Sequence, residues 1–474
     1  MPQRKAKRPA RRATGASETR SRTTVPPPML PPMPPSPPSA MSNDGRPETT
    51  GRFVAVLRDS AVAQPPAARA KINNLTGLRH VASSKDFGAG VTEVASLAGA
   101  DVLHFESLGI MILDSAEAAG VLAETSADVD SPILTIEPEY IARPSEVRPR
   151  ELFGYLRGYR DASEHIYAEF SNGMTAVVEE EVSRVLQDTA QFTWGLQAIG
   201  AHTSSLAGQG VKLAILDTGL DLAHPDFIGR PIVTQTFTGV PVQDVHGHGT
   251  HCAGTACGPR TPASGVRRYG VAPGAHLHVG KVFNNAPRPQ APTGAVVAGI
   301  DWAMTMGCRV VSLSLGIAID QKLQQYEVPV RRALDAGTLV VAAAGNNARR
   351  NANIFGFVEP PANADAAMAV AAVDGQLQIA RFSARSSQQT GVGGIVNIAA
   401  PGVAVFSSVP GGLGGYDVFD GTSMATPHVA GVVALLAGAT GDTGQKLWNR
   451  LLQTARPMKL LSVDVGAGMV QAPQ

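Results

Sequence analysis

The sequence has few cysteines, few aromatic residues and almost no net charge. Its 474 residues contain three cysteines, too few for the disulfide framework of a small secreted protein. A net charge of +1 gives no overall electrostatic field that would attract nucleic acid. No apolar run approaches the roughly 18 to 20 residues that a membrane-spanning helix needs. We therefore expect neither a nucleic-acid partner nor a membrane span.

The residues that are abundant favour a globular protein with a sizeable core. Hydrophobic residues make up 44% of the chain and charged residues 17%. The 50 glycines and 35 prolines favour a loop-rich α/β protein. The length allows about two to four domains. Cys252, Cys257 and Cys308 are expected to be buried reduced thiols, although the first two are close enough in sequence for a disulfide.

The first 50 residues have a different composition from the rest. They open with the basic run "MPQRKAKRPARR" and continue with the proline-rich run "TVPPPMLPPMPPSPPSA". Such a segment cannot build a core, so we expect a disordered tail at 1–50. The alternative, a nucleic-acid-binding arm, is disfavoured because no aromatic residues interleave the basic ones. No secretory signal is readable, so we expect a cytoplasmic protein or export without a leader.

Residues 51–143 have the pattern of a small α+β domain. Strand-like runs at 52–59, 101–114 and 132–140 alternate with helix-like runs at 66–76 and 115–127. Because 101–114 reads as two short strands, the order is β-α-β-β-α-β, which is ferredoxin-like. The charged segment 144–191 is helix-permissive and is expected to be a helical linker.

From Gly210 onward the chain alternates apolar strands with helices. The strand-like runs are 211–217, 276–283, 308–316, 338–346 and 367–374, and the helix-like runs between them include 293–307 and 321–337. Continuous apolar strands of this kind are typical of a parallel sheet buried on both faces. The prediction is a doubly wound, mostly parallel α/β sheet, with functional residues at the carboxyl ends of its strands.

Polar residues stand at those strand ends. Asp217 closes the first strand in "LAILDTGLD", and Asn346 closes the fourth in "VVAAAGNN". The tripeptide DTG alone suggests an aspartic protease, but that chemistry needs two such carboxylates and no second DTG exists. The side-chain amide of Asn346 could donate to an oxyanion, while the plainer interpretation is a turn-forming Gly-Asn pair.

Two further motifs carry candidate chemistry. Three histidines, His246, His248 and His251, occur in "HGHGTHCAGT"; they could bind a metal, but H-x-H-x-x-H lacks the glutamate of H-E-x-x-H. Ser423 opens an apolar helix in "GTSMATPHVAG", where backbone N–H groups and the helix dipole favour an oxyanion. The plainer interpretation of this serine is an ordinary N-cap.

Taken together in order, the blocks "LAILDTGLD", "HGHGTHCAGT", "SLSLG", "AAAGN" and "GTSMATPHVAG" resemble the signature motifs of the subtilases. The resemblance covers about residues 192–474. It implies a serine endopeptidase acting through an acyl-enzyme, with Ser423 as nucleophile and His248 as general base. Asp217 would orient and stabilise the imidazolium, and Asn346 would donate to the oxyanion. Cys252, four residues after the base, is expected to lie close to it.

The same resemblance implies a substrate cleft. Ser314, Leu315 and Gly316 would pair with the substrate backbone, and Ala343, Ala344 and Gly345 would form a wall of the primary pocket. Counting back from "AVAAVD" places Glu359 near the floor of that pocket, where a carboxylate would favour a basic P1 residue. A surface-loop carboxylate is the alternative.

The resemblance also bears on maturation and metals. It implies that 51–143 is a propeptide that inhibits the enzyme within the same chain, removed by self-processing between about 141 and 192. We expect a monomer acting on protein or peptide substrates with no required cofactor. Structural calcium has only weak candidate ligands, Asp226 and Asn397. A catalytically silent subtilase-like binding module is the alternative function.

Overall fold

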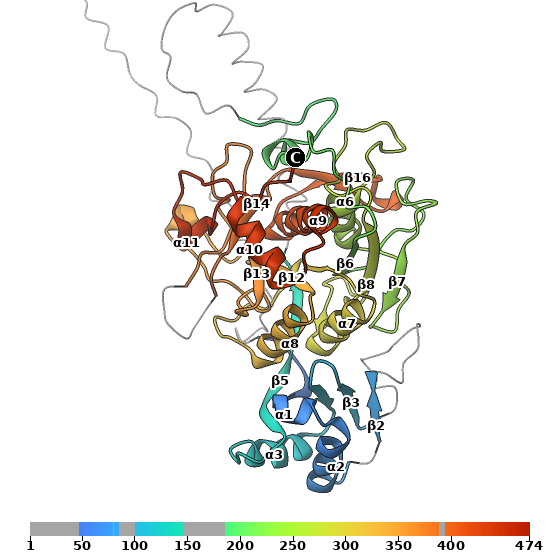
Figure 1. Ribbon diagram of the computed structural model, residues 1–474, viewed down its shortest axis with the longest axis vertical. Coiled ribbons are helices and arrows are strands. Elements are labelled where there is room, and N and C mark those ends of the chain that lie inside the picture. The colour runs from blue at the N-terminus through green and yellow to red at the C-terminus, as the bar shows by residue number, and fades with distance from the viewer. Residues whose placement is uncertain (1–46, 79, 85–99, 146, 148–184, 388–393) are drawn as a thin grey trace, which may run out of the picture. The chain divides into compact units, whose positions relative to one another are not determined.

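A computed structural model describes residues 47–78, 80–84, 100–145, 147, 185–387 and 394–474. The predicted tail at 1–50 and the predicted linker at 144–191 lie largely outside the described residues. Two seven-stranded sheets dominate the described chain: the first takes five of its strands from the N-terminal part, and the second is parallel and lies in the remainder (Figure 1).

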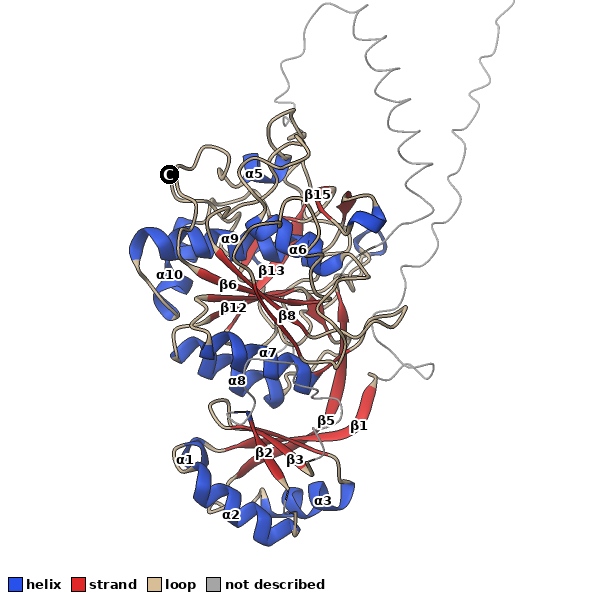
Figure 2. Ribbon diagram, turned by 90° about the vertical axis from the view of Figure 1, so that its right-hand side faces the viewer, coloured by secondary structure: helices blue, strands red, loops and turns tan. Residues whose placement is uncertain are grey.

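The N-terminal subdomain, Thr49–Pro144, has the predicted ferredoxin-like order with one added strand, Val81–Ser83, which was not predicted and pairs parallel with Val102–Phe105. Its strands run β5-β1-β4-β3-β2, with helices α2 and α3 against one face (Figure 2). The bounds are β1 (Thr49–Leu57), α1 (Asp59–Val62), α2 (Pro65–Thr76), β2 (Val81–Ser83), β3 (Val102–Phe105), β4 (Ile110–Leu113), α3 (Ala116–Thr125) and β5 (Ile133–Pro144). The hydroxyl of Ser115 caps α3 by accepting the N–H of Ala118 at 3.1 Å, as its sequence position predicts.

This first sheet is apolar on both faces because alternate residues of its strands point in opposite directions. In β1, Ala55 and Leu57 belong to a core shared with α2 and α3, whereas Val54 and Val56 belong to the core of the rest of the protein. The helices that cover this second face are α7 (Thr293–Thr305) and α8 (Gln324–Asp335), which lie between the two sheets (Figure 2).

The second sheet is parallel throughout, with the order β14-β13-β12-β10-β6-β8-β7. Its strands are β6 (Lys212–Asp217), β7 (Val233–Thr236), β8 (His276–Lys281), β10 (Val310–Leu313), β12 (Leu339–Ala343), β13 (Ala367–Val373) and β14 (Ile398–Pro401). Helices α6 (His248–Cys257) and α9 (Thr422–Thr440) cover the face opposite α7 and α8 (Figure 2). This is the predicted doubly wound fold.

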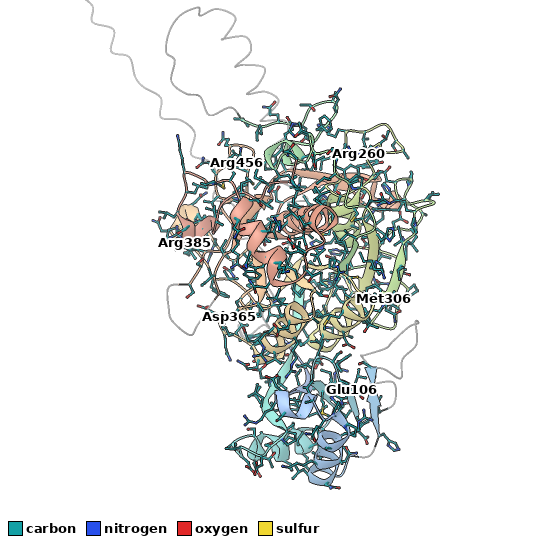
Figure 3. All side chains as sticks on the ribbon, viewed as in Figure 1. Glu106, Arg260, Met306, Asp365, Arg385 and Arg456 are labelled. Carbon is teal, nitrogen blue, oxygen red and sulfur yellow. The ribbon has the colours of Figure 1, made fainter. Side chains whose placement is uncertain are left out.

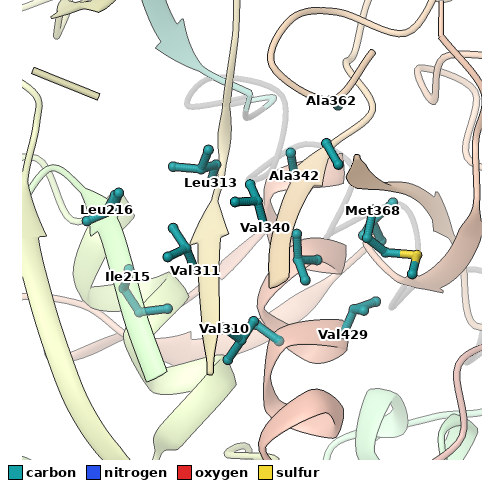
Figure 4. Close-up of a cluster of buried hydrophobic side chains, with 14 of the residues drawn as sticks. Ile215, Leu216, Val310, Val311, Leu313, Val340, Ala342, Ala362, Met368 and Val429 are labelled. Carbon is teal, nitrogen blue, oxygen red and sulfur yellow. The ribbon is translucent and has the colours of Figure 1, made fainter. Parts of the chain in front are cut away.

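Aliphatic side chains of neighbouring strands form the centre of the core. Ile215, Val311 and Val340 come from three adjacent strands, and Val429 of α9 packs nearby (Figure 4). Among the described helices, α9 is the one that is long and apolar enough to span a membrane. No apolar run of that length was expected from the sequence. Since 89% of the apolar stretch of α9 is buried, it is the central core helix.

Several elements differ from the sequence prediction. The predicted strand at 308–316 is interrupted at Ser314 and continues as β11 (Leu315–Gly316), which leaves the parallel sheet and pairs with β5. Strands β7 and β14 were not predicted, because "VTQT" is polar and "IAAP" ends in proline. The remaining elements are α5 (Trp194–Ala198), β9 (Ala291–Pro292), η3 (Arg350–Ala352), the hairpin β15 (Val405–Ser408) and β16 (Tyr416–Phe419), η4 (Gly411–Leu413), α10 (Gln445–Thr454) and α11 (Ser462–Val465).

The carboxyl-terminal segment is fixed to the larger domain by ion pairs. Asp464 of α11 accepts hydrogen bonds from Arg350 at 2.6 Å and from Arg385 at 2.7 Å. Figure 3 shows Arg385 at the edge of the molecule, and its guanidinium lies 3.7 Å from the centre of the Phe355 ring. These contacts hold the chain end against the sheet.

Candidate active site

Asp217 and His248 form a fully buried pair. Asp217 is the last residue of β6, and His248 is the first residue of α6. The Nδ1 atom of His248 lies 2.7 Å from the Oδ1 atom of Asp217, and neither side chain is exposed to solvent. Burial, the largest single influence, lowers the pKa of His248, but the charges and hydrogen bonds of Asp217 and Cys252 together outweigh burial and raise that pKa well above 6.5.

Asp244, which sequence reasoning missed, holds the loop that leads to His248. Its Oδ1 accepts the backbone N–H groups of His246 and Gly247, both at 2.9 Å. Its Oδ2 accepts the N–H of Thr250 at 2.9 Å and the hydroxyl of that residue at 2.7 Å. An aspartate just before a helix is a common cap, and that signal was available in "DVHGHGT".

Ser423 lies at the amino-terminal end of α9, facing the end of β10. Its hydroxyl donates to the carbonyl oxygen of Ser314 at 3.0 Å, and the hydroxyl of Ser314 donates to the Ser423 carbonyl at 2.9 Å. Among the described residues, the buried Nε2 atom of His248 has no hydrogen-bond partner. In this conformation the Ser423 hydroxyl therefore points to Ser314, and it must rotate to reach His248.

Asn346 follows β12 and has a fixed side chain. Its Oδ1 accepts both the backbone N–H and the hydroxyl of Thr422, each at 3.0 Å. These contacts turn the Nδ2 donor toward the cleft, where it lies 2.5 Å from the carbonyl oxygen of Ser145. The backbone N–H of Ser423 donates to the same oxygen at 3.2 Å. Thr422 is a second positioning residue that the sequence analysis missed.

The segment that ends in Ser145 lies as a strand between β11 and β9. On one side, Arg143 and Pro144 of β5 pair antiparallel with Gly316 and Leu315 of β11. The N–H of Ser145 continues this ladder by donating to the Ser314 carbonyl at 3.2 Å. On the other side, Ile141 and Ala142 pair with Pro292 and Ala291 of β9. The predicted backbone-pairing residues 314–316 therefore do pair with an extended chain.

Glu359 is buried beside the side chain of Ser145. Its Oε1 accepts from the amide of Asn347 at 2.9 Å. A Cβ atom built on Gly316 would overlap Oε2 of Glu359 and would lie 3.1 Å from the Ser145 hydroxyl, so both oxygens lie against Gly316. A Cβ on Gly345 would lie 3.0 Å from Glu359 carbons. Burial raises the pKa of Glu359 to about 7.

The predicted wall residues 343–345 lie next to Glu359. Ala343 closes β12, and both Ala343 and Ala344 are fully buried. The carbonyl of Ala344 accepts the N–H of Glu359 at 3.0 Å. Glu359 is therefore a buried carboxylate next to these residues and not an exposed one in a surface loop, while its place in a substrate pocket stays a prediction.

The three histidines of the His block do not form a metal site. The Nε2 atom of His251 lies 2.9 Å from the Val405 carbonyl, and its ring stacks on Phe419 at 4.4 Å. In the described part of the chain, the group with ligating geometry is Asp217, His248 and Cys252, whose ligand atoms lie within 4.8 Å of one another. Two of these three residues already form the buried pair.

The two candidate calcium ligands are engaged in hydrogen bonds that do not fit a cation. The carboxylate of Asp226 accepts from the hydroxyls of Tyr269 at 2.5 Å and Tyr416 at 2.9 Å, and from the N–H of Ala263 at 2.6 Å. The side-chain oxygen of Asn397 accepts the N–H of Ala369 at 2.7 Å. Calcium needs six to eight oxygen ligands, and both side chains are instead surrounded by donors.

The three cysteines are free and buried. The sulfur of Cys252 lies 3.9 Å from Nδ1 of His248 and 3.6 Å from the Ser423 carbonyl oxygen. It is therefore packed beneath the buried pair, as its position four residues after His248 predicts. Burial raises the pKa of its thiol to about 11.

Comparison with known proteins supports the resemblance to the subtilases. The model of the subtilase family matches residues 208–468. M-protease of Shouchella clausii is 36% identical over 62% of this chain and 72% of its own length. The thermostable alkaline protease of Halalkalibacterium halodurans is 30% identical over 77% of this chain and 98% of its own.

Solved structures show the same fold. Fervidolysin from Fervidobacterium pennivorans superposes with a TM-score of 0.62 at 23% identity, over 92% of this chain and 63% of that one. Sphericase superposes with a TM-score of 0.52 at 29% identity, over 60% of this chain and 99% of its own. With the family model covering more than half of the sequence, this chain belongs to the subtilase family of serine endopeptidases.

Proposed function

We propose that Asp217, His248 and Ser423 form the catalytic triad of this peptidase. The observation that carries the proposal is the carbonyl oxygen of Ser145, which accepts hydrogen bonds from the N–H of Ser423 and from Nδ2 of Asn346. Two donors aimed at one carbonyl beside a buried Asp–His pair are what acyl transfer requires.

The proposed reaction follows from these positions. The hydroxyl of Ser423 attacks the substrate carbonyl carbon and passes its proton to Nε2 of His248. Asp217 holds the ring through Nδ1 and stabilises the imidazolium. The oxyanion is held by the Ser423 N–H and by Asn346. His248 then gives the proton to the leaving amine, and water hydrolyses the acyl-enzyme.

We further propose that the chain is made as a zymogen in which residues 51–145 inhibit the protease domain. Strand β5 fills the cleft, and two of its carboxylates reach the helices beneath it. Glu137 accepts the N–H groups of Gln324 and Gln325 at the start of α8, at 2.9 and 3.0 Å. Glu139 accepts the N–H of Gly294 in the first turn of α7 at 2.8 Å. Negative charge at a helix amino terminus is stabilising, which favours tight binding of the subdomain.

The geometry around Glu359 supports a third proposal, a preference for substrates with arginine or lysine at P1. Glu359 lies against Gly316 and Gly345, and the Ser145 hydroxyl lies against the same Gly316. A long basic side chain would reach the carboxylate and pair with it.

A fluorophosphonate probe tests the triad. Purified wild type should be labelled at Ser423, with and without EDTA, and Ser423→Ala should not. The matched control Ser205→Ala, at an exposed serine, should label like wild type. Absence of labelling in processed wild type would indicate the silent binding module, and persistent labelling in Ser423→Ala would overturn the assignment of the nucleophile.

A further inference from the structure

A fully buried lysine, Lys281, lies next to Asp217 and has no place in the proposed triad. It closes β8, which runs beside β6 (Figure 2), and in the register of these two strands Lys281 is opposite Asp217. None of the residue is exposed to solvent. Lysine is almost never fully buried unless its charge is compensated, because removing an ammonium group from water costs several kcal/mol. The compensation for Lys281 must therefore come from the site around it.

The ammonium group of Lys281 binds two backbone carbonyls of this site. Its Nζ donates to the carbonyl oxygen of Thr218 and, at 3.4 Å, to that of Gln243. Thr218 directly follows Asp217 in the chain, and Gln243 directly precedes Asp244, which holds the loop that leads to α6. One buried cation thus joins the two segments that carry the buried carboxylates of the site.

Thr218 connects this contact to both carboxylates. Its N–H donates to Oδ1 of Asp217 at 2.7 Å, and the same oxygen faces Nδ1 of His248. Its hydroxyl donates to Oδ1 of Asp244 at 3.0 Å and accepts the N–H of Gly249 at 2.8 Å. A displacement of the Thr218 backbone would therefore move Asp217 relative to His248. In a catalytic site, a displacement of about 1 Å can lower the rate about 10²-fold.

Charge gives Lys281 a second connection to the site. Burial, the largest influence, lowers the pKa of Lys281, and the negative charges of Asp244 and Asp217 act in the opposite direction. This attraction is mutual, so the ammonium group stabilises the two carboxylates. For the same reason it opposes protonation of His248, which Asp217 and Cys252 favour.

We propose that Lys281 is a positioning residue for peptide hydrolysis: it holds Asp217 against His248 through Thr218, and its charge offsets the charges of the buried carboxylates. The inference rests on the proposed triad and adds a residue that touches neither the substrate nor the reacting atoms. A lysine that served the fold alone would contribute to stability without affecting the basicity of His248. The two roles therefore differ in the pH dependence of the rate.

The pH dependence of two variants tests the inference. Lys281→Gln keeps a hydrogen-bond donor but removes the charge, and Lys281→Met removes both. Values of kcat/KM are measured on a peptide with leucine at P1, so that pairing with Glu359 does not contribute, and are referred to the amount of enzyme titrated by a fluorophosphonate. We expect the acid side of the kcat/KM profile to move up by about one pH unit in both variants, because loss of a nearby positive charge raises the pKa of His248. Loss of the donor should make kcat about 10-fold lower in Lys281→Met than in Lys281→Gln.

Lys212→Met is the matched control. Lys212 opens β6, the strand that Asp217 closes, and its Nζ donates to the carbonyl of Met306 at 2.8 Å, so it makes the same kind of bond at the opposite end of the strand. The control should retain the profile and the kcat of the wild type.

Three results would overturn the inference. The first is an acid side that coincides with that of the wild type, or lies below it, in both Lys281 variants. The second is an unchanged kcat in Lys281→Met. The third is failure of both Lys281 variants to fold while Lys212→Met folds, because Lys281 would then serve the fold alone. Absence of Ser423 labelling in the wild type refutes the proposed triad instead, and is distinguished from these results by the wild type alone.

Discussion

Under the proposed mechanism, the pH range of the protease is set by two buried side chains, Asp217 and His248. Because Asp217 and Cys252 together raise the pKa of His248 well above 6.5, the proposed base is protonated and inactive below that raised pKa and becomes neutral as pH rises through it. We expect kcat/KM of the processed enzyme to fall on the acid side at a pH above 6.5. In Asp217→Asn the acid side of the kcat/KM profile should move to lower pH, and kcat should fall about 10⁴-fold. An unchanged limb in the variant would contradict this origin.

Removal of the side-chain donor at the oxyanion site should reduce turnover. We expect Asn346→Ala to lower kcat about 10²- to 10³-fold with little change in KM, the range established for one such donor in subtilisin-type enzymes. Thr422→Val should lower kcat about 10-fold, because it removes one of the two contacts that orient Asn346. Thr422→Ser keeps the hydroxyl and should restore the rate. Loss confined to KM would indicate a role in binding instead.

Glu359 should couple substrate choice to pH. Since its pKa is about 7 in the filled cleft, the carboxylate becomes charged as pH rises through neutrality. We expect the ratio of kcat/KM for arginine over leucine at P1 to increase at least 10-fold between pH 6 and 8. Glu359→Gln should show a flat ratio. A clear apolar preference of the wild type across this range would refute the assignment.

Cys252 offers a chemical probe of the buried pair. We expect an organic mercurial to inhibit the peptidase activity by reacting with the Cys252 thiol, which lies next to His248. The reacting thiolate is scarce when the thiol pKa is about 11, so the rate of inhibition should be slow at neutral pH and rise about tenfold per pH unit. Cys252→Ala should resist inhibition, while Cys308→Ala, in which a cysteine remote from the site is lost, should remain sensitive. Equal inhibition of both variants would refute this site.

At the scale of elements, contact between β5 and the helices beneath it should be measurable as stability. In an inactive Ser423→Ala background, Glu137→Gln should lower the free energy of unfolding by about 1 kcal/mol, because it weakens the bonds to the start of α8. Glu124→Gln, at an exposed position of α3, is the matched control. The measurement is urea unfolding at pH 7, and identical midpoints for the two variants would contradict the expectation.

The sequence predicted long apolar elements well and short ones poorly. The predicted strands at 211–217, 338–346 and 367–374 correspond to β6, β12 and β13. They could be predicted because a strand that is buried on both faces has a continuous apolar sequence. In contrast, β9 and β11 contain two residues each and carry no pattern of their own. They are strands only because β5 lies between them. Such pairing is a property of the folded chain and is not encoded locally.

The same distinction applies to the site. The positions of Asp217, His248, Asn346 and Ser423 follow from recognisable motifs at strand and helix ends. Ser145 could not be identified this way, because nothing in "ARPSEV" marks a serine whose carbonyl reaches residues 200 to 280 positions away. Its role depends on the register of β5, which is set by Glu137 and Glu139.

At the scale of the whole molecule, the two parts are linked through one continuous core. Val54, Val56 and Ile112 of the first sheet belong to the same apolar cluster as the strands of the second sheet. Separation of the N-terminal subdomain after cleavage therefore exposes apolar surface on both sides. This cost, together with the carboxylate–helix contacts, is expected to keep the cut fragment bound as an inhibitor.

Because the carbonyl of Ser145 occupies the proposed oxyanion site, we expect a delay before freshly made protein shows activity on outside substrates. Under the proposed zymogen mechanism, a molecule whose own carbonyl occupies the oxyanion site does not act on an outside substrate until the chain has been cut and the fragment has departed. Progress curves of fresh protein should therefore begin with a lag whose duration reflects fragment departure rather than turnover. Molecules that mature early destroy the fragments released by the others, so activity should rise in a sigmoidal, self-accelerating manner. The rate at which β5 leaves the active site would thus set the time at which activity begins.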